Sequence, residues 1–105
     1  MRQDFINHFK ALQELVHDNI KEKGFHDTPR TVGDGVALIL TELAEYYEAF
    51  RHNNPPSEHI PGFSAMEEEL ADKVIRCMDE AGLRGFRLAE AIVAKHAFNL
   101  TRPHK

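Results

Sequence analysis

Two pairs of acidic residues occur at a spacing that suits metal chemistry. Glu42 and Glu45 form one pair, and Glu69 and Asp72 form the other, each three residues apart. In a helix, residues three apart lie on one face, about one turn from each other. Two antiparallel helices that each carry such a pair would bring four carboxylates together. Carboxylate oxygens are ligands that Mg²⁺ prefers, together with water and substrate phosphates.

The first pair lies in a stretch with few other charges. Between residues 36 and 50 the only charged residues are three glutamates, and no Lys or Arg stands three or four positions from Glu42 or Glu45. Burying an ionised carboxylate costs several kcal/mol unless it is paired or binds a metal. Lys73 and Arg76 offer the second pair local partners. A metal site is one interpretation, and ordinary charges on two solvated helix faces are the alternative.

The elements that carry these residues are predicted to be helices. Apolar residues recur at helical spacing in four segments, whereas alternating strand patterns are nearly absent. The helices are expected over about residues 3–23, from 32 or 34 to 52, over 65–81 and over 86–100. A capping box formed by Ser64 and Glu67 begins the third, and Gly82 is expected to end it.

The second of these segments is apolar almost all round, which is typical of a central, buried element. The order of segments predicts an all-α fold, a helical bundle of about four helices. Residues 1–105 form a single domain on this interpretation. A domain this short buries little of its surface, so we expect oligomerisation to complete the bundle.

Composition excludes several classes of protein. The chain has 105 residues, 42% of them hydrophobic and 29% charged, so whole-chain disorder is not expected. Its net charge of -4 argues against nucleic acid as a partner. A single cysteine, Cys77, excludes a disulfide-stapled scaffold and fits a reducing compartment.

The chain also lacks membrane signals. Its longest apolar run, residues 36–40, is far shorter than the roughly 20 residues that cross a bilayer. Charges interrupt the N-terminal segment every few residues, so no signal-peptide core is present. We expect a soluble, cytoplasmic protein with no membrane partner.

The seven histidines form no HExxH motif and only one Glu-x-x-His spacing, Glu14 to His17, whereas a ferritin-like di-iron centre needs two. Zinc-protease and ferritin-like di-iron chemistry are therefore not expected. The predicted role of the histidines is as scattered surface residues. They are His8, His17, His26, His52, His59, His96 and His104.

The order of the acidic pairs resembles the signature of a known family. Glu42-Leu43-Ala44-Glu45, 23 further residues and then Glu69-Leu70-Ala71-Asp72 are similar to the ExxE…ExxD motif of MazG-like nucleotide pyrophosphohydrolases. These enzymes belong to the all-α NTP pyrophosphohydrolase superfamily. Lys95, Asn99 and Arg102 resemble the C-terminal K…N..R pattern of the family.

The resemblance covers about residues 35–105, and the first predicted helix matches only in being helical. It departs from the family at Thr41, where some relatives carry a further acid. No catalytic role of that acid carries over to this chain.

The resemblance implies hydrolysis of a nucleoside triphosphate, or its deoxy form, to the monophosphate and pyrophosphate. It implies Mg²⁺, with Mn²⁺ as a substitute, on Glu42, Glu45, Glu69 and Asp72. Glu42 and Glu45 are the implied catalytic residues, and the choice of proton acceptor between them stays open. Lys95, Asn99 and Arg102 are the implied substrate-binding residues.

The implied partners are the nucleoside triphosphate substrate and further copies of the chain, in a homodimer or homotetramer. Two alternatives stay open. One is a hydrolase restricted to a single modified nucleotide. The other is a non-enzymatic helical interaction or nucleotide-binding protein that keeps the fold. The C-terminal cations then simply form a solvated helix end, where positive charge favours the helix dipole.

Overall fold

The computed structural model describes residues 2–103, which form four α-helices and no β-strand. Helix α1 spans Arg2–Glu22, α2 spans Val32–Arg51, α3 spans Ala65–Arg84 and α4 spans Leu88–Thr101. The predicted all-α fold with four helices is therefore confirmed. None of these helices is long and apolar enough to cross a membrane.

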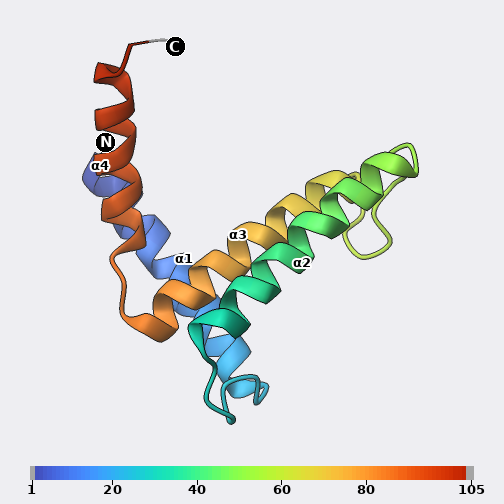
Figure 1. Ribbon diagram of the computed structural model, residues 1–105, viewed down its shortest axis with the longest axis horizontal. Coiled ribbons are helices and arrows are strands. Elements are labelled where there is room, and N and C mark those ends of the chain that lie inside the picture. The colour runs from blue at the N-terminus through green and yellow to red at the C-terminus, as the bar shows by residue number, and fades with distance from the viewer. Residues whose placement is uncertain (1, 104–105) are drawn as a thin grey trace.

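Helices α2 and α3 form an antiparallel hairpin, the long arm to the right in Figure 1. Both begin with a capping box. Thr31 and Asp34 exchange hydrogen bonds at the start of α2, and Ser64 and Glu67 do the same at α3, as predicted for Ser64. These caps satisfy backbone N–H groups that a helix start leaves unpaired, and they set where each acidic pair lies along its helix.

Helix α1 links the hairpin to the last helix. It packs against α3 and against α4, and α4 rises beside the first half of α1 as a second arm. The chain is thus V-shaped, with α2 and α3 in one arm and α4 in the other (Figure 1).

The predicted end of α3 at Gly82 is wrong. The helix continues to Arg84, and Gly85 forms the left-handed C-cap with φ 71°. A Cβ atom on Gly82 would lie 2.8 Å from Cγ of His17. Gly82 is therefore small because α1 approaches α3 closely there, not because the helix stops.

The predicted burial of α2 is also wrong for the single chain. Within α2 only Gly35 and Glu42 are buried. Its large apolar side chains are mostly exposed, because α2 packs chiefly against one other helix, α3. The buried apolar residues among those described are Met78, Ala81 and Ala89.

Candidate metal centre

The hairpin brings three of the four predicted acids into one cluster. Glu42 of α2 and Glu69 and Asp72 of α3 each offer a carboxylate oxygen, and these oxygens lie within 4.8 Å of one another. Glu42 is 7% exposed, and Glu69 and Asp72 are half-buried. The prediction that these residues converge from two neighbouring helices is supported by this geometry.

Glu45 lies at the edge of the cluster. Its side chain is exposed, and with Glu69 it lines an open hollow of about 310 Å³ near the end of α2. His52 and Pro55 line the same hollow. Glu45 therefore stands between the buried acids and solvent.

The cluster raises the pKa values of its members. Burial, and then the adjacent Glu45, raise the pKa of Glu69 to about 7. Burial, and then the negative charge of Glu68, raise the pKa of Asp72. Burial also raises the pKa of Glu42, although the hydrogen bond from Arg76 opposes this in part. The positive charge near these acids, chiefly that of Arg76, therefore does not offset the burial and mutual repulsion that raise their pKa values.

Two oxygens of the cluster are buried without a hydrogen-bond partner, Oε2 of Glu42 and Oε2 of Glu69. A buried acceptor without a partner is costly, and a cation that binds it removes the cost. All the donors here are carboxylate oxygens, the set that suits a hard cation such as Mg²⁺. The residues present therefore fit a divalent metal ion.

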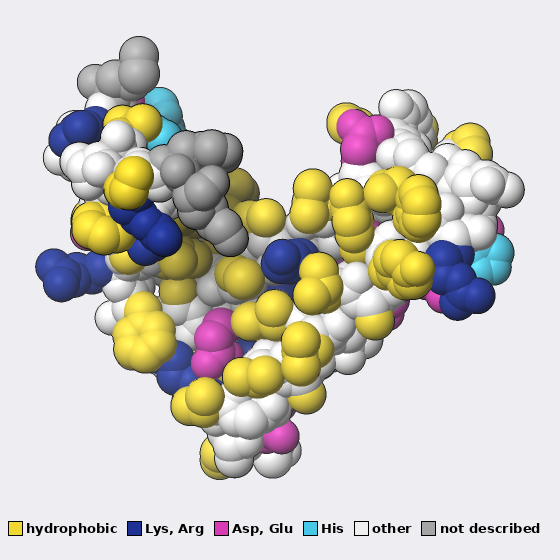
Figure 2. Space-filling view, turned by 45° about the horizontal axis from the view of Figure 1, so that its top comes forward, with side chains coloured by type: hydrophobic (Ala, Val, Ile, Leu, Met, Phe, Trp, Pro, Cys, Tyr) yellow, Lys and Arg dark blue, Asp and Glu magenta, His cyan; other side chains and the backbone are white. Residues whose placement is uncertain are grey.

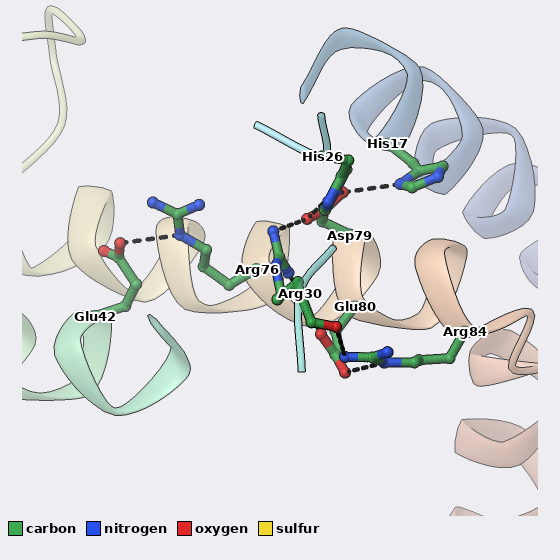
Figure 3. A network of polar contacts seen from close by, with 8 residues as sticks. All are labelled: His17, His26, Arg30, Glu42, Arg76, Asp79, Glu80 and Arg84. Carbon is green, nitrogen blue, oxygen red and sulfur yellow. Dashed lines mark hydrogen bonds and ion pairs between the residues drawn. The ribbon is translucent and has the colours of Figure 1, made fainter. Parts of the chain in front are cut away.

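Arg76 is the cationic neighbour of the centre. Its Nε donates to Oε1 of Glu42 over 3.2 Å, as Figure 3 shows. The sequence offered Arg76 as a local partner of Asp72, and its hydrogen bond goes instead to the facing helix. Arg76 also lines a second hollow, together with Phe25, Thr28 and Leu38.

The predicted substrate-binding residues lie apart from the acids. Lys95, Asn99 and Arg102 are all exposed and belong to α4 and its C-cap, in the other arm of the V. Lys95 and Arg102 both approach the ring of Phe98, at 4.7 Å and 5.9 Å from its centroid. Within one chain, the structure does not bring these cations to the carboxylate cluster.

A second polar cluster, centred on Asp79, was not anticipated from the sequence. The fully buried Asp79 accepts hydrogen bonds from Nδ1 of His17 at 2.8 Å, Nε2 of His26 at 2.8 Å and Nη2 of Arg30 at 2.9 Å (Figure 3). Arg30 continues to Glu80, which also binds Arg84. The expectation that all histidines lie on the surface is therefore wrong for His17 and His26.

The Asp79 cluster joins α1, the loop after it and α3. His17, His26 and Asp79 also offer three ligand atoms within 4.8 Å. Both histidines bond directly to Asp79 and Arg30 neutralises it, so the Asp79 carboxylate is fully paired within the fold, whereas Nδ1 of His26 is buried without a hydrogen-bond partner. One sequence signal was available, because Asp79 stands among the apolar residues Met78 and Ala81.

Comparisons with protein-family models, with curated proteins and with solved structures find no match to this chain. The likeness to MazG-like enzymes therefore depends on the motif residues and on the carboxylate cluster.

Proposed function

We propose that the protein is a Mg²⁺-dependent nucleoside triphosphate pyrophosphohydrolase, which converts (d)NTP and water to (d)NMP and pyrophosphate. The observation that carries the proposal is the convergence of Glu42, Glu69 and Asp72, two of which bury an unpartnered oxygen. The motif resemblance supplies the reaction class. We assign the activity to the cytoplasm, where nucleoside triphosphates are available.

Glu42, Glu45, Glu69 and Asp72 hold the metal in this proposal. A bound divalent ion neutralises phosphate oxygens and lowers the pKa of a coordinated water. The chain's own carboxylates supply the remaining acid–base chemistry. Glu42 is held by Arg76, whereas Glu45 is exposed at the hollow, so Glu45 is the better placed to accept a proton from the attacking water.

Lys95, Asn99 and Arg102 bind the triphosphate in this proposal. Lysine and arginine are charge-assisted donors to phosphate oxygens. Asn99 stands four residues after Lys95, so the two side chains project from the same face of α4.

The test is pyrophosphate release from a panel of canonical and modified nucleoside triphosphates with Mg²⁺, and with Mn²⁺ in its place. Glu42→Gln and Asp72→Asn should each lower turnover by at least about 100-fold, because each removes a metal ligand. Glu14→Gln, an exposed acid on α1, is the matched control and should turn over normally. Full activity in Asp72→Asn would show that the acids are not the catalytic centre.

The separation of the α4 cations from the acids favours a second candidate, a helical protein that binds nucleotides without hydrolysing them. A nonhydrolysable triphosphate with Mg²⁺ would then raise the melting temperature of the protein. At one hundred times its Kd, the ligand should increase the free energy of unfolding by about 2.7 kcal/mol. Binding without pyrophosphate release from any substrate in the panel would establish this alternative.

A further inference from the structure

We propose that Arg76, which holds Glu42 of the metal centre and also lines the second hollow, binds the phosphates that leave as pyrophosphate. This assignment rests on the proposed function, because it names the group that receives the leaving part of the substrate. Arg76 lies outside the two acidic motifs and outside the C-terminal motif, so the family resemblance gives it no role.

Arg76 has more hydrogen-bond donors than its contact with Glu42 uses. It stands four residues after Asp72, one turn further along α3, and its Nε reaches Oε1 of Glu42 on the facing helix over 3.2 Å. A guanidinium carries five N–H donors, and Nη1 and Nη2 make no hydrogen bond to the residues that the structure describes (Figure 3). The side chain is 28% exposed, so these donors are available to an anion from solvent.

The second hollow has a volume of about 240 Å³, and three charged side chains line it. Arg30 is already paired with Asp79 and Glu80, and Asp34 is committed to the capping box of α2. Arg76 is the one of the three that keeps unpaired donors on a positive charge. Two parallel donors on a guanidinium match two oxygens of a phosphate group.

The two hollows lie on opposite sides of the acids along the hairpin. Leu38, which lines the second hollow, stands one turn before Glu42 on α2. The first hollow is lined by Glu45 and His52, which follow Glu42 toward the end of α2. A phosphate at the acids therefore has Glu45 on one side and Arg76 on the other.

This order suits an in-line displacement, in which the attacking and leaving oxygens lie on opposite sides of the phosphorus. The water oxygen bonds to the α-phosphorus, and Glu45 accepts the proton of the water. The bond from the α-phosphorus to the bridging oxygen breaks, and its electron pair stays on the pyrophosphate. Arg76 stands where it can neutralise the charge that develops on that oxygen.

A purely structural ion pair between Arg76 and Glu42 explains less. The pair uses a single hydrogen bond rather than the two of a fork, and the pKa of Glu42 stays raised by burial in spite of it. The hairpin also needs a cation of its own for phosphates, because Lys95 and Arg102 belong to the other arm. Figure 2 shows an open notch between the two arms, with Lys and Arg side chains along the left-hand arm.

The first experiment measures the binding of inorganic pyrophosphate by calorimetry at saturating Mg²⁺. Arg76→Gln should bind pyrophosphate about 10- to 100-fold more weakly, because it removes charge-assisted hydrogen bonds. Arg76→Lys should recover part of the loss, since it keeps the charge without the fork. Arg87→Gln, an exposed position at the start of α4, is the matched control and should bind normally. Equal affinities for Arg76→Gln and Arg87→Gln would overturn the proposal.

Mg²⁺ binding without pyrophosphate distinguishes this role from the positioning of Glu42. Arg76→Gln should bind Mg²⁺ as well as the unaltered protein or more tightly, because the variant removes a positive charge beside a metal ligand. A loss of Mg²⁺ affinity that matches the loss of pyrophosphate affinity would show that Arg76 acts only through Glu42, and it would overturn the assignment.

Chemical modification tests the contact without any variant. Phenylglyoxal modifies arginine, and peptide mass spectrometry follows each site. Pyrophosphate with Mg²⁺, at about ten times its Kd, should slow the modification of Arg76 about tenfold, since only the free fraction reacts. The rate at Arg87 should not change. An unprotected Arg76 under these conditions would contradict the proposal.

Turnover separates this inference from the proposed function. Arg76→Gln should lower kcat by about 100-fold, because it removes stabilisation of the leaving group. Pyrophosphate release with an unchanged kcat in Arg76→Gln would overturn the role of Arg76 and leave the proposed function intact. A protected Arg76 in a protein that releases pyrophosphate from no triphosphate would support the binding site and overturn the proposed function.

Discussion

The Asp79 carboxylate is fully enclosed, and its environment decides its charge state. Burial alone would raise the pKa of Asp79, but the hydrogen bonds from His26, His17 and Arg30 together lower it below its ordinary value of 3.8. The ionised form is therefore the one that the fold requires. Its stabilisation is fully present above pH 3.8 and is lost as the pH falls through the lower pKa of the folded state.

Asp79→Asn should lower the free energy of unfolding by about 3 kcal/mol, because it removes the buried charge that Arg30 pairs with at 2.9 Å and leaves Arg30 only its 3.3 Å contact with Glu80. Chemical denaturation at neutral pH measures this effect. Below pH 3.8 the difference from the unaltered protein should shrink, since the Asp79 carboxylate of the unfolded chain is protonated there while the native carboxylate, whose pKa is lower, still resists protonation. Asp18→Asn, an exposed position on α1, should change stability by less than about 0.5 kcal/mol.

At the scale of single residues, spacing predicted which acids converge but not which cations meet them. Glu42, Glu69 and Asp72 come together because helical periodicity and an antiparallel hairpin are enough to place them. The pairing of Arg76 with Glu42 and of His17 with Asp79 depends on how two helices face each other across 34 and 62 residues of sequence. A local pattern carries no information about that.

The helices follow from local signals, with one instructive exception. Capping boxes and periodicity place the starts of α2 and α3. Gly82 misled the sequence interpretation because a glycine needed for close packing between helices looks the same as one that ends a helix. Only the contact with His17 distinguishes the two roles.

Gly82→Ala should therefore destabilise the protein by about 1–2 kcal/mol, although alanine is the better helix former. The added methyl group would force the His17 ring away from α3. Gly33→Ala is the matched control in the first turn of α2, where an added Cβ would meet only Thr31 Oγ1, at an ordinary contact distance of 3.7 Å. It should leave thermal stability unchanged or raise it by up to about 1 kcal/mol. A stabilising Gly82→Ala would show that α1 does not need this close approach.

The shape of the whole molecule was the least accessible to sequence reasoning. Periodicity identified the apolar stripe of α2, but it does not say whether the stripe faces the same chain or another. The V shape leaves the stripe open and separates the acids from Lys95. If both groups serve one reaction, they must come from different chains.

Mixing two inactive variants tests this. Glu42→Gln and Lys95→Ala should each lose pyrophosphate release alone. Refolded together in equal amounts, they should recover about one quarter of normal activity, since half of the pairs are mixed and each mixed pair contains one intact site. Absence of recovery, with mixed pairs demonstrated by mass, would place both groups of one site in the same chain.

The attachment of α4 has a mechanical consequence. Helix α1 contacts α3 near His17, and the first half of α1 packs against α4. The direction of the arm that α4 forms is therefore set by the contact at the Asp79 cluster. The 15 residues between Arg2 and His17 span about 22 Å of helix. A tilt of α1 by about 10° about this contact would move the N-terminal end of α1 by about 4 Å, which is longer than a hydrogen bond.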